Sequence, residues 1–201
     1  MSRLWLALLL ALCAWQAGQW WRLRPVQQAN GVLVAEDPRQ QPVEIDGFNY
    51  RDYRLSPRAS YHLRARLLSR ESYRLGREAE LSPLDFALGW GVMSDNRVLD
   101  ALEISQSGRY FWLRWGEAAP ASETEMLRHA ANTHLIPADD SVRRALARMR
   151  PGQVVALDGW LVDVAAKDGW QWQSSLTRSD TGAGACELLW VRSASVLLRG
   201  K

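Results

Sequence analysis

Asn132, His134 and Cys186 are the residues of this chain whose types best suit thiol chemistry. A cysteine becomes a strong nucleophile when a neighbouring base takes its proton, and histidine is a common base. Asn132 and His134 belong to the segment NTHLIPADD, which we expect to form an irregular connection between two helices. Polar groups in such connections bind either the backbone or a ligand. These three residues are therefore candidates for a thiol or hydrolase site.

A purely structural role is the competing interpretation of Cys186. It alternates with Leu188 and Trp190 in the segment ACELLWV, a pattern typical of a small apolar side chain in a buried strand. Because cysteine is among the most buried residue types, this interpretation has the better statistical support. Cys13 lies in the N-terminal segment, so we expect no disulfide within the body of the protein.

The segment from 174 to 190 combines hydroxyl groups, an arginine and glycines. It contains Asp180-Thr181-Gly182, the triplet of aspartic proteases, but no apolar strand leads into it, so we interpret it as a glycine-rich turn between strands. Arg178 and Thr181 are weak candidates for binding an anion there.

Metal binding is not expected from this sequence. His129 and His134 are five residues apart, whereas ligands on one helical face need a spacing of three or four, and no cysteine pair has a zinc-site spacing. We therefore expect neither a metal nor another cofactor.

A basic segment between Arg51 and Arg77 holds eight arginines and two acidic residues, Asp52 and Glu71. Arg64 and Arg66 are its candidates for binding an anionic ligand. The alternative is an ordinary solvated surface paired with nearby acids. Since no aromatic residues alternate with these arginines, we do not expect nucleic acid as a partner.

The N-terminal segment has no charge from residue 4 to residue 21, a stretch that would form a helix of about 27 Å. It predicts a single-pass anchor in a bacterial inner membrane, in contact with lipid, with the body in the periplasm. The alternative is a signal peptide that is cleaved after export to the periplasm.

The rest of the chain predicts an α+β fold of mainly antiparallel strands. With 47% apolar and 23% charged residues, the composition is that of a globular protein with a real core. We expect a small barrel or sandwich, of the oligonucleotide-binding (OB) or SH3 kind, with two or three short helices and a preceding N-terminal hydrophobic helix. Three regions are predicted, of which the last two may share one domain: 1–24 (anchor or signal peptide), 25–118 (β-rich, with a short helix near 83–90) and 122–201 (helix, helix, then strands).

Four motifs, SPLDFALGWGVMSD, NTHLIPA, GQVVALDGWLVDV and SSLTRSDTGAGACELLWV, occur in this order between residues 80 and 198. In these motifs the chain resembles a family of bacterial membrane-anchored or exported proteins without an assigned activity. The resemblance supports a membrane-associated protein and implies no catalytic residue or cofactor.

Taken together, the sequence favours a membrane-tethered accessory or binding domain outside the cytoplasm, without enzymatic activity, whose partner is another envelope protein. Two alternatives stay open. One is a hydrolase or thiol enzyme that uses His134, Asn132 and Cys186. The other is a binder of anionic ligands through the segment Arg51–Arg77.

Overall fold

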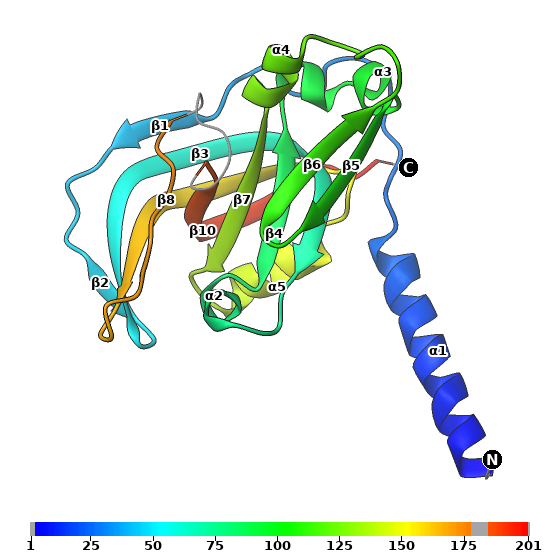
Figure 1. Ribbon diagram of the computed structural model, residues 1–201, viewed down its shortest axis with the longest axis horizontal. Coiled ribbons are helices and arrows are strands. Elements are labelled where there is room, and N and C mark those ends of the chain that lie inside the picture. Colours follow the sequence, from blue (N-terminus) through cyan, green and yellow to red (C-terminus); the bar gives the residue numbers. More distant parts are fainter. Residues whose placement is uncertain (1–2, 178–184, 201) are drawn as a thin grey trace.

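The computed structural model describes residues 3–177 and 185–200 and shows an α+β fold of mostly antiparallel strands (Figure 1). Five strands form its centre: β3 (Tyr53–Ser72), β4 (Leu84–Gly89), β7 (Ala130–Pro137), β8 (Val154–Ala166) and β10 (Glu187–Leu198). The predicted fold class is confirmed at this level.

These five strands close into a ring through their hydrogen-bonded pairs. β3 pairs with β4, β4 with β7, β7 with β10, β10 with β8, and β8 again with β3. The β7–β10 pair is parallel and the other four pairs are antiparallel. Both halves of the chain, 25–118 and 122–201, therefore supply strands to this one ring.

Alternation along the strands separates an apolar interior from an outer face. Tyr61, Leu63, Ala65 and Leu67 of β3 are buried, as their alternation with His62, Arg64 and Arg66 predicts. They pack with interior residues of the other four strands, among them Phe86 and Leu189. A second apolar cluster lies outside the ring and includes Leu188, Trp190 and several partly buried aromatic side chains.

Shorter elements surround the ring. Their bounds are β1 (Arg39–Pro42), β2 (Phe48–Tyr50), α2 (Arg77–Leu81), a 3₁₀ turn at Gly91–Ser94, α3 (Asn96–Leu99), β5 (Leu102–Ser107), β6 (Tyr110–Trp115), α4 (Glu123–Arg128), α5 (Asp140–Arg148) and β9 (Gln171–Trp172). β5 and β6 form a hairpin that is a separate two-stranded sheet. Ser122 caps α4 with its side chain, as the sequence predicts, and of the two candidates Asp139 and Asp140 it is Asp139 that caps α5.

Two segments that bear on the site differ from the prediction. The helix expected near 83–90 is strand β4, and the irregular connection expected around Asn132 and His134 is strand β7. The local helix signal of Ser82 and Pro83 is overridden because β4 pairs along both edges, with β3 and with β7. β7 is likewise paired on both sides.

The N-terminal segment is the helix α1 (Arg3–Leu23), which projects away from the ring (Figure 1). Within residues 3–177 and 185–200, no helix combines the length and apolar character needed to cross a membrane. The predicted single-pass inner-membrane location is therefore wrong. The apolar run is weakened by Gln16, Gly18 and Gln19 in its second half, which the absence of charge alone did not reveal.

Candidate active site

The candidate site lies on the outer face of three adjacent strands. In the register of the sheet, Asp85 of β4 stands opposite His134 of β7, and Leu188 of β10 stands opposite His134 on its other side. Residues paired in this way project to the same face of a sheet. Asn132, two residues before His134, and Cys186, two before Leu188, therefore share this face. Strand pairing thus brings together side chains that are far apart in the sequence.

Each carboxylate oxygen of Asp85 contacts a basic side chain, that of Arg109 or that of His134. Its Oδ1 accepts a hydrogen bond from Nη1 of Arg109 at 2.7 Å, and its Oδ2 lies 2.8 Å from Nδ1 of His134. Asp85 is fully buried and His134 is 4% exposed. Within the described part of the chain, Oδ2 and Nδ1 have no other hydrogen-bond partner, so their mutual contact compensates for their burial.

The surroundings of His134 favour its protonated form. Burial acts to lower the pKa of His134, but hydrogen bonds to Asp85 and Cys186 and the charges of these groups outweigh it and raise the pKa to about 9. At neutral pH His134 is therefore an imidazolium. One carboxylate, that of Asp85, therefore faces two cations, Arg109 and His134.

Cys186 lies within reach of three polar groups of the site. Its thiol is one of the groups that raise the pKa of His134. The Nδ2 group of Asn132 points at its Sγ from 3.6 Å and also donates to the backbone oxygen of Arg109 at 2.8 Å. The same backbone oxygen lies 3.8 Å from Sγ. Cys186 is partly exposed, so its thiol combines these contacts with access from solvent.

Arg109 links the β5–β6 hairpin to the site. Gly108 and Arg109 form the two-residue turn of the hairpin, and both have positive φ angles of 58° and 72°. This conformation suits the tight turn but is uncommon for a residue with a side chain. Its guanidinium lies over the Tyr73 ring at 3.8 Å and donates to the Ser82 backbone as well as to Asp85. These contacts hold the turn in place.

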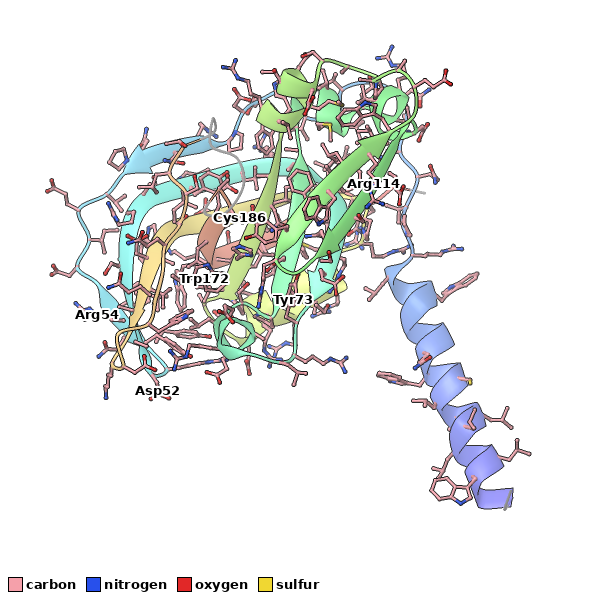
Figure 2. All side chains as sticks on the ribbon, in the orientation of Figure 1. Asp52, Arg54, Tyr73, Arg114, Trp172 and Cys186 are labelled. Atoms are coloured by element: carbon pink, nitrogen blue, oxygen red, sulfur yellow. The ribbon has the colours of Figure 1, made fainter. Side chains whose placement is uncertain are left out.

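The site opens into a pocket of about 550 Å³. One wall is the hairpin tip, one is the strand face with His134 and Cys186, and one is the segment around β9. Figure 2 shows Trp172 and Cys186 close together in the middle of the body. The Trp172 ring lies 4.9 Å from the His134 ring, measured between centroids. The lining residues are Glu78, Gly108, Arg109, Tyr110, His134, Gln171, Trp172, Gln173 and Cys186.

The other predicted ligand residues do not join this site. Arg64 is exposed on β3 and lines a separate, smaller depression with His62 and Asp158. Arg66 is buried and donates to the backbone oxygen of Ser94 at 3.1 Å. Arg178 and Thr181, with the whole Asp180–Gly182 triplet, lie outside the described residues.

Most other arginines of the basic segment Arg51–Arg77 bind groups of the protein itself. Arg58 pairs with Asp163, Arg77 pairs with Asp168, and Arg70 donates to two backbone oxygens at the C-terminal end of α5. These contacts occupy guanidinium groups that an anionic ligand would need.

Sequence reasoning missed Asp85, Arg109 and Trp172. Asp85 falls within the short helix expected near 83–90, near whose start a carboxylate is common and gives no sign of a site. Arg109 lies in a hairpin turn, and the local sequence of the turn does not predict that its side chain binds Asp85. His134 and Cys186 were recognised by residue type. Finding that Asp85 lies opposite His134 requires the register between β4 and β7.

Comparison of this chain with models of protein families, with curated proteins and with solved structures finds no match. The geometry of the site is therefore what indicates a function.

Proposed function

We propose that this protein is a cysteine-dependent enzyme of acyl transfer, with Cys186 as nucleophile and His134 as acid and base. One observation carries the proposal: Cys186 and a histidine fixed by a buried carboxylate line the same open pocket. A nucleophile, a base and a group that orients the base are the recurring parts of such sites. The sequence had favoured a structural cysteine, and the partners of Cys186 now weigh against that interpretation.

Each residue has a distinct role in the proposed reaction. The Cys186 sulfur, as thiolate, attacks the carbonyl carbon of the substrate, and the bond to the leaving group breaks as the His134 imidazolium gives that group a proton. The neutral imidazole then takes a proton from water, whose oxygen attacks the thioester. The carbon–sulfur bond breaks, which releases the acid and restores the thiolate and the imidazolium.

Asp85 and Asn132 support these steps without reacting. Asp85 holds Nδ1 of His134, which leaves the other ring nitrogen for proton transfer. One N–H of Asn132 is used by the Arg109 backbone, and the N–H directed at Sγ is placed to donate to the oxyanion that forms there.

The test compares the two cysteines of the chain under native conditions. Cys13 is exposed on α1 and serves as an internal reference for Cys186, which is only partly exposed. We expect iodoacetamide to modify Cys186 faster than Cys13, because His134 lies beside the Cys186 thiol in the pocket. The variant His134→Gln should lose this excess. Mass spectrometry should also find p-nitrophenyl acetate leaving one acetyl group on Cys186. A Cys186 that reacts more slowly than Cys13, and equally in His134→Gln, would contradict the proposal.

We also propose that the ring is a barrel of the OB kind. Supporting this assignment, it has five strands, and helix α5 lies between its third and fourth strands in chain order. Barrels of this kind bind ligands on the face of their second and third strands and in the adjoining loops. β4 and β7 occupy those positions, and the pocket lies against them.

This placement favours a second candidate function, that of an accessory or binding domain that holds a ligand or a partner protein in the pocket without chemistry. An unreactive Cys186 in the alkylation test would support it over the enzyme.

A further inference from the structure

Strand β9 presents a free edge beside the candidate site. It is the last strand of the hydrogen-bonded path through the sheet, and among residues 3–177 and 185–200 it pairs with β8 alone. Its register places Trp172 opposite Val164 and Gln171 opposite Ala165. An unpaired strand edge carries main-chain donors and acceptors that suit another extended chain.

The hydrogen-bonding pattern identifies the free main-chain groups. The backbone N–H of Ala166 donates to the oxygen of Trp170 at 2.8 Å. Bonded and non-bonded pairs alternate in an antiparallel ladder, so the main-chain groups of Trp170 and Trp172 face β8. Those of Gln171 and Gln173 point to the opposite side, where the described part of the chain gives them no hydrogen-bond partner.

This free edge borders the pocket that holds the thiol. Gln171, Trp172 and Gln173 line it together with His134 and Cys186, and the hairpin tip forms the facing wall. An added strand would run about 4.8 Å from β9, within the space between these walls. Trp172 and Tyr110 offer aromatic surfaces for its side chains, and Tyr110 is 41% exposed.

We propose that the substrate is a peptide in extended conformation that pairs with the free edge of β9 and so presents a backbone carbonyl to Cys186. This inference rests on the proposed function. Main-chain hydrogen bonds would supply affinity, and the aromatic surfaces would favour apolar side chains. In the reaction above, the bond that breaks is then the peptide C–N bond, and the proton from His134 goes to the leaving amine.

The experiment uses the full chain with Cys13→Ser, so that Cys186 is the reactive thiol that is measured. Three probes are compared: iodoacetamide, an acetylated leucyl tripeptide chloromethyl ketone, and the same ketone with N-methyl groups on the amides that would face β9. N-methylation removes the donors and leaves the electrophile unchanged. We expect the unmethylated peptide to modify Cys186 at least about tenfold faster than its methylated form, a difference of the size expected for lost hydrogen bonds. Cys186→Ala should remove all labelling.

The outcomes separate the two proposals. Equal rates for the two peptides, with Cys186 still more reactive to iodoacetamide than in His134→Gln, would overturn the peptide inference and leave a small acyl compound as the substrate. If iodoacetamide modified Cys186 no faster than it does in His134→Gln, the proposed function itself would be overturned.

Discussion

Asp85 and His134 stand opposite one another in the register of β4 and β7, and their side chains meet at 2.8 Å in the buried part of the site. The contact depends on two strands that lie far apart in the sequence. It supplies the charge that keeps His134 protonated, and it places the ring beside Cys186. Structure and proposed chemistry are therefore linked through this one pair.

The His134 contact makes stability depend on pH. The folded pKa of His134 is about 9, above its ordinary value of 6.5, so its stabilisation is complete below pH 6.5 and is lost as pH rises through 9. A difference of this size corresponds to about 3 kcal/mol. We expect the free energy of unfolding, measured with urea, to fall across this window in the wild type. A His134→Gln variant with the same decrease would show that another group titrates.

Removing the carboxylate of Asp85 from its buried pair with His134 should destabilise the protein, whereas removing a carboxylate from an exposed ion pair should change its stability little. Asp85→Asn leaves Arg109 and His134 without their anion, and we expect a loss of about 3 kcal/mol of stability. It should also return the pKa of His134 toward its ordinary value, which NMR titration measures. The matched control is Asp158→Asn, because Asp158 pairs with His62 on the exposed surface. Equal losses in both variants would contradict the structural account.

Replacing Arg109 should lower the stability of the protein more than replacing Arg114 on the same hairpin. Arg109→Met keeps much of the side-chain length but removes the donors to Asp85 and Ser82, and we expect a loss of about 2–4 kcal/mol. Arg114→Met changes an exposed residue whose nearest acid, Glu103, lies 3.9 Å away, and it should be close to neutral. Thermal unfolding of the two variants makes the comparison. A neutral Arg109→Met would mean that the hairpin does not depend on this residue.

Gly159 is expected to tolerate no side chain. A Cβ atom there would lie 1.9 Å from the backbone oxygen of Trp190, where β8 and β10 pair. We expect Gly159→Ala to destabilise the protein by on the order of 3 kcal/mol because the two strands must separate. Gly116→Ala is the control, since nothing lies within 4 Å of its added atom. The two midpoints of chemical unfolding should differ clearly, and similar values would be evidence against the β8–β10 pairing.

Sequence patterns identified the elements whose signals are local. Alternation predicted the central part of β3, and side-chain caps predicted the starts of α4 and α5. β4 and β7 were missed because their extended conformation comes from pairing with strands distant in the sequence. Long-range pairing also limited the prediction of the site. His134 and Cys186 were found by residue type, whereas finding Asp85 requires the β4–β7 register and finding Arg109 requires the position of the hairpin against the ring. The resemblance to a family of exported proteins stays a prediction.

Closure of the ring has a consequence for self-association. Open strand edges invite pairing between molecules, and in the ring each of the five strands pairs with one neighbour on either side. Beyond the ring, the outlying strands of this sheet are short: β1 has four residues, β2 three and β9 two. Short edges template fibres poorly, so this architecture can keep the edge of β9 available near the Cys186 thiol with little risk of polymerising through it.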